Sequence, residues 1–344
     1  MKKQRWISIL ILIFGGIIFC SSVTIAKPIE LSLGLIVPPK HLRYIHVIEP
    51  WIKMIEERTK GAVKINPYFN MTLAPAAEMF DATVSGVADI SESYTFGVPG
   101  KFAMTEFLQL PETGFRSSLS CSRAVWHLYK TFPEVQAEYK GVKVLWLHTT
   151  PGMKLMLKRK PVRSLEDLKG LKIAVSGATM VKVGKALGFS PVTMPTADIY
   201  VAQDKGVIDG HIRPSELLIS RRFFEVTKYG IENIDLGHDI FFVAMNLKAW
   251  EKLPPEVKKV FEELSGDWAV DFTGKAWDKF DKDAETEVKA KGFEFITLPP
   301  KEVERWRKLL APIKEEYAQE LEAKKMPGKK ILEELKKLAE KVKE

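Results

Sequence analysis

Residues 161–210 read PVRSLEDLKGLKIAVSGATMVKVGKALGFSPVTMPTADIYVAQDKGVIDG, and this stretch decides the fold. SLEDLKG predicts a short polar helix, and the apolar alternation over 171–175 predicts a half-buried strand after it. A helix is expected to open at Ser176 and to end at Gly188. A second strand and a second helix are predicted over 192–194 and 197–205. This βαβα order favours a parallel sheet that binds ligands at its strand ends.

Other segments of the chain also show the apolar alternation of strands or the apolar spacing of helices. The apolar spacing of residues 46–60 predicts a helix. A long helical pattern begins at Pro255 and ends at Gly292. Gly266 and Gly274 each weaken it by about 1 kcal/mol, so it is expected as one helix or as two. No internal repeat is evident. Further strands are predicted at 31–37, 62–69, 142–147, 171–176, 240–246 and 293–298.

Composition describes a water-soluble α/β protein that is large enough for two domains. The 344 residues are 46% hydrophobic and 28% charged, with a formal net charge of +8. Much of the positive charge lies beyond residue 323, where Lys is interleaved with Glu as on a solvated helix face. Because stacking aromatic side chains are missing there, no nucleic-acid partner is expected.

The first 26 residues carry the pattern of an export signal. MKKQR is a basic start, and the apolar core 6–19 has 14 residues, short of the roughly 20 that span a bilayer. Small residues at Thr24 and Ala26 suit a signal peptidase, so cleavage after Ala26 and a periplasmic or extracytoplasmic location are expected. Retention of the segment as a membrane anchor is the alternative outcome.

The chain lacks the sequence motifs of common catalytic and cofactor sites. GxSxG, HExxH, a phosphate-binding P-loop and GxGxxG after a strand do not occur. The closest histidine pair, His41 and His46, has no cysteine nearby, so no metal site is expected. Phe19 before Cys20 argues against a lipoprotein, and removal of Cys20 leaves Cys121 as a lone thiol that is expected to be buried. No cofactor and no enzymatic activity are expected.

Several of these motifs together resemble one family. SLEDLKGLKI, then ALGFSPVTMP, then VIDG followed by HIRP stand in the order found in the solute receptors of tripartite ATP-independent periplasmic (TRAP) transporters. The flanking stretches LSLGLIVPPKH, EFLQLP and NLKAWEKLPPEVKKVFEE are similar to that family as well, and the resemblance covers roughly Glu30 to Glu263. It implies an α/β fold of the two-lobed periplasmic-binding-protein-like kind (class II type), with a long helix crossing both lobes. Hinge crossings are expected near 150–152 and 238–240. Lobe I is expected to comprise 27–151 and 240–278, and lobe II 152–239 and 279–344.

The resemblance also implies which residues contact a ligand, with one departure. Receptors of this family usually hold a ligand carboxylate with an Arg at the position of Ala174, and alanine cannot form that ion pair. Arg213, where the family commonly has Asn, offers two parallel donors to a carboxylate. An ion pair of Arg213 with Glu216 or Asp198 is the alternative. Lys154 keeps the charge of a second family Arg in the cleft, or lies on the solvated surface.

Six further positions match segments that face the ligand in this family. Each of them is also compatible with an ordinary place in the core. The loss of an aromatic side chain at Thr196 is expected to enlarge the pocket, and Phe241 and Phe242 are expected to supply an aromatic wall instead. The six positions are His41, Tyr94, His148, Thr196, Phe241 and Phe242.

The implied function is that of an extracytoplasmic solute receptor that works by hinge closure. It binds a small solute, expected to be an organic acid, between its lobes and delivers it to the membrane subunits of a TRAP-type permease. A receptor that presents its ligand to a sensor kinase is one alternative, and a periplasmic enzyme on the same fold is another. Permease genes beside this one would favour transport, and turnover of a ligand would establish an enzyme.

Overall fold

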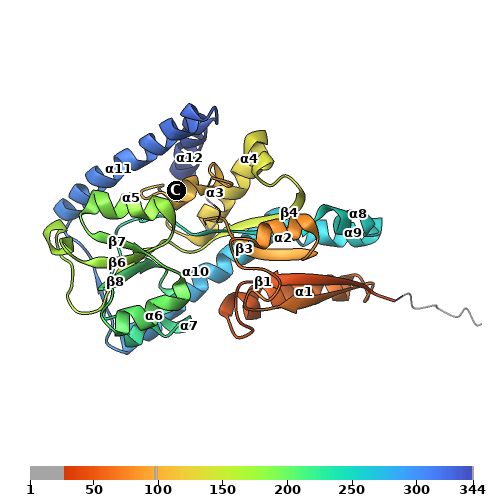
Figure 1. Cartoon of the computed structure of the whole chain (residues 1–344), viewed down its shortest axis with the longest axis horizontal. Helices are drawn as coiled ribbons and strands as arrows, with labels where there is room; N and C mark the ends of the chain where they lie inside the picture. Colours follow the sequence, from red (N-terminus) through yellow and green to blue (C-terminus); the bar gives the residue numbers. More distant parts are fainter. Residues whose placement is uncertain (1–26, 97, 99, 343–344) are drawn as a thin grey trace, which may run out of the picture.

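The computed structural model describes residues 27–96, 98 and 100–342. The chain forms two mixed sheets with helices against them (Figure 1). The first sheet consists, in spatial order, of β2 (Val63–Tyr68), β1 (Ile29–Leu35), β3 (Ile90–Tyr94), β10 (Ile240–Asn246) and β4 (Val142–Thr149). The second consists of β11 (Glu294–Ile296), β9 (Tyr229–Ile231), β5 (Lys154–Leu157), β8 (Gly210–Arg213), β6 (Lys172–Val175) and β7 (Ser190–Thr193). The expected export signal, with Cys20 and the cleavage site, lies outside the described residues.

Helices connect most of these strands. The pattern that begins at Pro255 forms two helices, because Leu264 and Ser265 interrupt it. The predicted polar helix before β6 is a single 3-10 turn, η3 (Leu165–Leu168), held by a capping box that starts at Ser164. The α-helices are α1 (Glu49–Arg58), α2 (Met79–Ser85), α3 (Ser118–Thr131), α4 (Pro133–Glu138), α5 (Gly177–Leu187), α6 (Thr196–Asp204), α7 (Glu216–Ser220), α8 (Leu247–Lys252), α9 (Pro255–Glu263), α10 (Gly266–Ala290), α11 (Pro300–Ala323) and α12 (Gly328–Val342). The other short turns are η1 (Tyr44–Ile48), η2 (Thr105–Gln109) and η4 (Phe223–Glu225).

The two sheets are built on the same succession of elements. In the first sheet β1, α1, β2, α2 and β3 give the spatial order β2-β1-β3, and in the second β6, α5, β7, α6 and β8 give β7-β6-β8. The neighbouring strands within both triplets are parallel. Asp89 accepts a hydrogen bond from the N–H of Ser32, and Asp209 accepts one from the N–H of Lys172, each at 2.8 Å. The structure therefore contains a topological repeat, and the sequence carries a trace of it, because the pattern A-x3-G-V-x-D occurs at 82–89 and again at 202–209.

One long helix and two extended crossings join the sheets. The chain passes from β4 to β5 through residues 150–153 and from β9 to β10 through residues 232–239. Helix α10 lies against α3 and β4 beside the first sheet and against α7 beside the second, which confirms the expected helix across both lobes (Figure 1). The C-terminal hairpin also touches both sides, because α11 contacts α5 and α12 contacts α3. The division of the chain into the two expected lobes stays a prediction.

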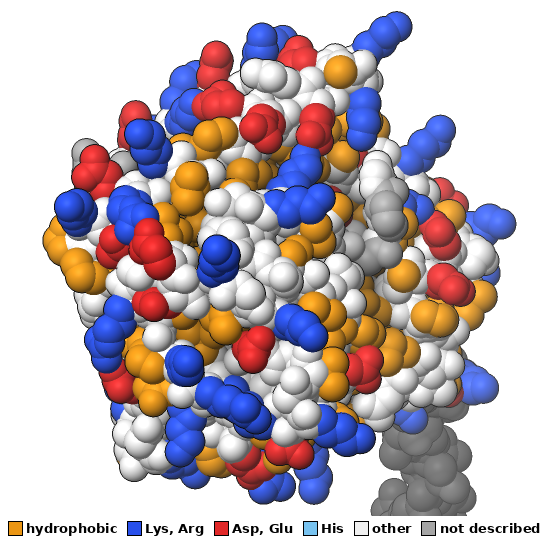
Figure 2. Space-filling view, turned by 60° about the vertical axis from the view of Figure 1, so that its left-hand side comes forward, with side chains coloured by type: hydrophobic (Ala, Val, Ile, Leu, Met, Phe, Trp, Pro, Cys, Tyr) orange, Lys and Arg blue, Asp and Glu red, His pale blue; other side chains and the backbone are white. Residues whose placement is uncertain are grey.

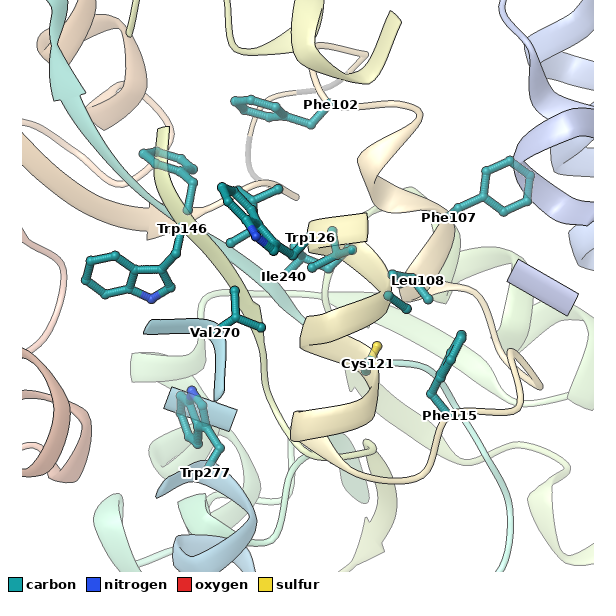
Figure 3. Close-up of a cluster of buried hydrophobic side chains, with 14 of the residues drawn as sticks. Phe102, Phe107, Leu108, Phe115, Cys121, Trp126, Trp146, Ile240, Val270 and Trp277 are labelled. Carbon is teal, nitrogen blue, oxygen red and sulfur yellow. The ribbon is translucent and has the colours of Figure 1, made fainter. Parts of the chain in front are cut away.

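Large aromatic side chains fill the core beside the first sheet. Trp51 of α1 and Trp146 of β4 are buried and meet edge to face, with 5.2 Å between their ring centroids. Figure 3 shows the side chains of α3, β4 and α10 gathered in one cluster, among them Trp126, Trp146 and Trp277. Cys121 of α3 belongs to the same cluster and is buried, as predicted.

Charges of both signs are interspersed on the surface. On the face drawn in Figure 2, Lys and Arg side chains lie among Asp and Glu, with small hydrophobic groups between them. Many of these charges are paired, for example Arg163 with Glu294 at 2.9 Å. Within the described part of the chain, no helix combines the length and the apolar character that a membrane span requires. Nor do three or more His, Cys, Asp or Glu side chains of those residues gather as a metal site would require.

Candidate functional site

The candidate site lies where the strand ends of the two sheets face each other. β1 leads into the loop of His41 and Arg43, β3 ends at Tyr94, and β8 ends at Arg213. The start of α5 lies against the loop after β3, because a Cβ on Gly177 would be 3.8 Å from the Cβ of Phe96. Ligands of α/β proteins bind at such carboxyl ends of strands.

Arg213 is a buried guanidinium held mainly by neutral oxygens. The residue is 2% exposed. Its Nε–H donates to the hydroxyl of Thr196 at 3.2 Å, and its Nη1 donates to the carbonyl of Ile212 at 2.7 Å. Longer contacts of 3.5 Å reach Oγ of Ser176 and the carbonyl of Met194. These contacts fix the plane of the guanidinium but bring it no counter-charge.

No carboxylate oxygen of the described residues lies within 4.0 Å of the Arg213 guanidinium. The alternative ion pairs with Glu216 and Asp198 are therefore not formed. Burial lowers the pKa of Arg213, and the charge of Asp239 acts in the opposite direction. Burial likewise raises the pKa of Asp239, against the attraction of Arg213. A cation desolvated in this way attracts an anion strongly, because little water screens it.

Aromatic rings of lobe I line this place. Tyr94 and Phe96 stack with 4.1 Å between their centroids and 12° between their planes. Phe241 of β10 meets Tyr94 edge-on at 6.5 Å and stacks on the imidazole of His148 at 5.2 Å. These rings form a continuous apolar wall beside the charged groups, as small-molecule sites commonly have.

Arg43 is a second buried guanidinium, on the opposite lobe from Arg213. It is 2% exposed, and its central carbon lies 4.3 Å from the centroid of Phe241 and 5.7 Å from that of Trp277. Its Nε is 3.0 Å from Oε1 of Glu92, but the two groups are not aligned for a hydrogen bond. No hydrogen bond joins its terminal nitrogens to another described residue. Arg43 thus presents free donors beside an aromatic wall.

The tautomer of His148 follows from its neighbours. The indole N–H of Trp277, which can only donate, lies 3.2 Å from Nδ1 of His148. Nδ1 is therefore the acceptor, and in the neutral ring Nε2 carries the proton. Burial lowers the pKa of His148, although Glu92 opposes the change, so the ring is neutral. Its Nε2–H points toward Oε1 of Glu92 at 3.7 Å, too far for a hydrogen bond.

Two further ionisable residues lie beside this group, Glu216 from lobe II and His41 from lobe I. Glu216 of α7 is 2% exposed, and burial raises its pKa to about 7, with Asp281 acting in the same direction. Arg43 and Arg221 lie near enough to oppose that shift. His41 accepts the backbone N–H of Arg43 on Nδ1 at 3.2 Å, and burial lowers the pKa of His41 to about 3. His41 therefore shapes the loop as a neutral group.

Lys154 belongs to a separate cluster of charges. Its Nζ lies 3.0 Å from Oδ2 of Asp281 and 2.8 Å from Oε1 of Glu285, both on α10. Burial lowers the pKa of Lys154, but the two carboxylates raise it further, so the net shift is upward. All three residues line a groove of about 1430 Å³ between the hinge, α10 and α11, and Arg213 does not line it.

Replacing Lys154 by methionine is expected to lower the free energy of unfolding by about 2–3 kcal/mol, because Asp281 and Glu285 would lose their shared cation. Chemical denaturation measures this loss. Lys53→Met is the matched control, since Lys53 pairs with Glu49 in an exposed position and should contribute less than about 1 kcal/mol. A variant of Lys154 that keeps its stability but loses ligand affinity would instead place Lys154 at the ligand.

The structure brings together most of the residues that the sequence singled out. Arg213 and Thr196 share a hydrogen bond, and Tyr94, His148 and Phe241 form one aromatic group. Phe242 lies elsewhere. It points into the core, where its ring meets those of Phe80 and Phe102 at 5.5 and 5.9 Å, because neighbouring residues of a strand face opposite sides.

Three charged residues of the site were missed by sequence reasoning. Arg43 follows β1 by several residues, Glu92 interrupts an otherwise uncharged strand, and Asp239 stands in the second crossing. Glu92 carried a usable signal, because a carboxylate inside a buried strand is rare unless it has a partner or a function. Arg43 carried none, since a basic residue in a loop is usually solvated.

Comparison with known proteins places the chain among binding proteins. The family model of the bacterial extracellular solute-binding proteins, family 7, matches residues 33–320. A 2,3-diketo-L-gulonate-binding periplasmic protein of Escherichia coli K12 is 28% identical over 210 residues, which are 60% of this chain and 62% of that relative. A C4-dicarboxylate-binding periplasmic protein of Rhodobacter capsulatus is 23% identical over 335 residues, which are 90% of this chain and 95% of that relative.

A solved structure agrees with this placement. The TRAP periplasmic solute-binding protein of Bordetella bronchiseptica, with bound (R)- and (S)-mandelate, is 27% identical and has a TM-score of 0.83. The match covers 92% of this chain and all of that one. The two-lobed fold expected from the sequence is thereby confirmed.

Proposed function

The chain belongs to family 7 of the bacterial extracellular solute-binding proteins, and from that premise we propose that it binds a small carboxylate-containing solute between its lobes and delivers it to a TRAP-type membrane permease. Its N-terminal segment directs export and is cleaved after Ala26. The membrane subunits of the permease are its partners, and the protein itself carries out no chemistry.

One observation carries the carboxylate assignment. Arg213 is buried and has no carboxylate of the described residues within 4.0 Å. A desolvated cation without a carboxylate in direct contact is costly, and a ligand carboxylate would supply that contact. Mandelate, C4-dicarboxylates and 2,3-diketo-L-gulonate, which the three relatives bind, are all carboxylates. Arg213 would thus take over the task that Ala174 cannot perform.

Transport requires that the ligand prefer the closed arrangement of the lobes. A solute that bridges Arg213 on one lobe and Tyr94 or Phe241 on the other gains its full set of contacts only when the lobes are together. Equal affinity for the open and closed states would shift no population, so these contacts to both lobes drive closure. The closed form would then be the one that docks on the permease.

A thermal-shift screen of the chain from Lys27 onward tests this proposal. We expect stabilisation by carboxylates and not by neutral sugars, with about 2.7 kcal/mol at a ligand concentration 100 times the dissociation constant. Arg213→Gln should lower the affinity for the carboxylate found in the screen by at least about tenfold, since the substitution removes a charge-assisted hydrogen bond.

Arg163→Gln is the matched control, because Arg163 is an exposed arginine of the same lobe that pairs with Glu294. It should bind like the unaltered protein. Stabilisation by neutral solutes alone would overturn the carboxylate assignment. Full carboxylate affinity in Arg213→Gln would remove Arg213 from the site.

A further inference from the structure

Buried polar atoms without hydrogen-bond partners gather at one place between the lobes. Seven of the fourteen such side-chain atoms among the described residues belong to six residues in or near α7 and around Phe241. Each orphaned polar atom costs about 1–3 kcal/mol when it stays unpaired, so their concentration in one spot indicates a place where a ligand group binds. The atoms are Nε of Arg43, both carboxylate oxygens of Glu92, Nε2 of His148, Oε2 of Glu216, Oγ of Ser220 and Nε of Arg221.

Donors and acceptors are mixed within the lobe I part of this group. Glu92 is 0% exposed, and although its Oε1 lies 3.0 Å from Nε of Arg43 in an ion pair, neither of its oxygens accepts a hydrogen bond. Arg43 offers N–H donors, and His148 offers its Nε2–H, because Nδ1 accepts the indole N–H of Trp277. A group that enters here must therefore both donate to Glu92 and accept from Arg43 or His148.

The common polar substituents of small solutes differ in this respect. A second carboxylate accepts hydrogen bonds from Arg43 and His148 but is repelled by Glu92. An ammonium group donates to Glu92 but is repelled by Arg43 and leaves the proton of His148 unpaired. A hydroxyl donates one hydrogen bond and accepts two, so it can pair with one oxygen of Glu92, with Arg43 and with His148 without a like-charge contact.

We propose that Arg43, Glu92 and His148 form a subsite for a hydroxyl group of the solute, so that this receptor takes a hydroxylated carboxylate. The proposal rests on the proposed function, in which Arg213 binds the carboxylate. Phe241 lies against Arg43, His148 and Tyr94 and provides the apolar surface for the body of the solute between its two polar ends. Arg43 and Glu92 are binding residues that set specificity.

Isothermal titration calorimetry on two matched series of ligands tests the subsite. The first series is phenylacetate, mandelate, phenylglycine and phenylmalonate, which place hydrogen, hydroxyl, ammonium and carboxylate on one scaffold. The second is benzoate, 3-hydroxybenzoate, 3-(aminomethyl)benzoate and isophthalate, which place the same groups farther from the carboxylate. We expect the hydroxylated member of the better-fitting series to bind at least about tenfold more tightly than the member with hydrogen.

Variants of the chain assign that preference to the subsite. Glu92→Gln keeps the shape of the side chain but removes its charge, and should reduce the advantage of the hydroxyl about fivefold while phenylacetate or benzoate binds as before. Glu30→Gln, which alters an exposed glutamate of the same sheet, is the matched control and should keep the full advantage. If Glu92→Gln does not fold, the order of ligand affinities in the unaltered protein still tests the hydroxyl subsite.

The outcomes separate the two proposals. Equal affinity for the hydroxyl and hydrogen members of both series would overturn the hydroxyl subsite and leave the carboxylate function intact. Tightest binding of the ammonium or the second carboxylate would overturn it as well. A hydroxyl preference that Glu92→Gln leaves unchanged would remove Glu92 from the subsite. Absence of binding by every carboxylate in both series would overturn the proposed function, and the subsite with it.

Discussion

Gly237→Ala is expected to destabilise the protein by about 4 kcal/mol or more, because no side chain fits at this point of the hinge. Gly237 has a φ of +87°, and an added Cβ would lie 2.2 Å from the carbonyl oxygen of Gln109 and 2.8 Å from that of Leu110. Both contacts are with backbone atoms, which cannot rotate away. The carbonyl of Gly237 also accepts the N–H of Met153, so the two hinge crossings would be pushed apart together. Unfolding in guanidinium chloride measures the loss.

Gly61→Ala separates the two causes of that loss. Gly61 has a φ of +78°, but nothing lies within 4 Å of the Cβ that it would carry. Its replacement should therefore lower the free energy of unfolding only by the strain of a left-handed backbone, about 1–2 kcal/mol. The excess cost at Gly237 then measures the clash. Similar losses of unfolding free energy in the two variants would mean that the hinge backbone moves to accommodate the Cβ and that the close contact does not destabilise the protein.

The fold was predictable because its signals are local. Strand alternation over 171–175, the glycine stop at Gly188 and the apolar spacing of 46–60 each act within a few residues, and the structure has a strand or a helix at each of them. The topological repeat was missed, although the pattern A-x3-G-V-x-D at 82–89 and 202–209 records it. The two turns share Ala, Gly, Val and Asp at equivalent places, but the strands themselves share few residues, since each lobe fills its core with different apolar side chains.

The site was predictable only where a family motif marked it. Arg213 and Tyr94 lie in segments whose motifs are specific, and the structure places both at strand ends that face the other lobe. Arg43 and Glu92 meet although 49 positions separate them in the chain, and the fold alone brings them together. No local pattern records such a contact, because it depends on how β1, β3 and α10 pack.

For the hinge, the sequence predicted the position of the crossings but not the interactions that hold them together. Crossings near 150–152 and 238–240 were expected, and the chain passes between the sheets at 150–153 and 232–239. Besides backbone hydrogen bonds such as Met153 N–H to the carbonyl of Gly237, one histidine side chain bridges them. Nδ1 of His238 lies 2.9 Å from the carbonyl oxygen of Thr150, and Nε2 lies 3.0 Å from that of Phe115. Carbonyl oxygens only accept, so both ring nitrogens donate and the buried ring is an imidazolium.

This imidazolium is expected to make the stability of the protein fall as the pH rises from about 6.5 to about 10. Burial alone would lower the pKa of His238, but Cys121, Asp235 and the carbonyl of Thr150 raise it to about 10. The folded state thus keeps a proton that the unfolded chain releases near pH 6.5. The contribution is complete below pH 6.5 and disappears through pH 10, at up to roughly 1.4 kcal/mol per pH unit. Unfolding free energies measured at intervals between pH 6 and 10 give the slope.

His238→Gln isolates the contribution of that proton. Glutamine can donate to a single carbonyl with its amide but does not titrate, so the variant should be less stable at pH 6 by several kcal/mol and should lose most of the slope above pH 7. Burial also raises the pKa of Glu106 to about 8 and of Glu138 to about 7, which lowers stability with rising pH in the same direction. Both glutamates are present in the two proteins, so the difference between the two stability curves belongs to His238.

His46→Gln, the control variant, changes an exposed histidine and should follow the unaltered protein. A His238→Gln curve parallel to the unaltered one would show that the ring is neutral in the folded state and that one of the two carbonyls is bound by something else.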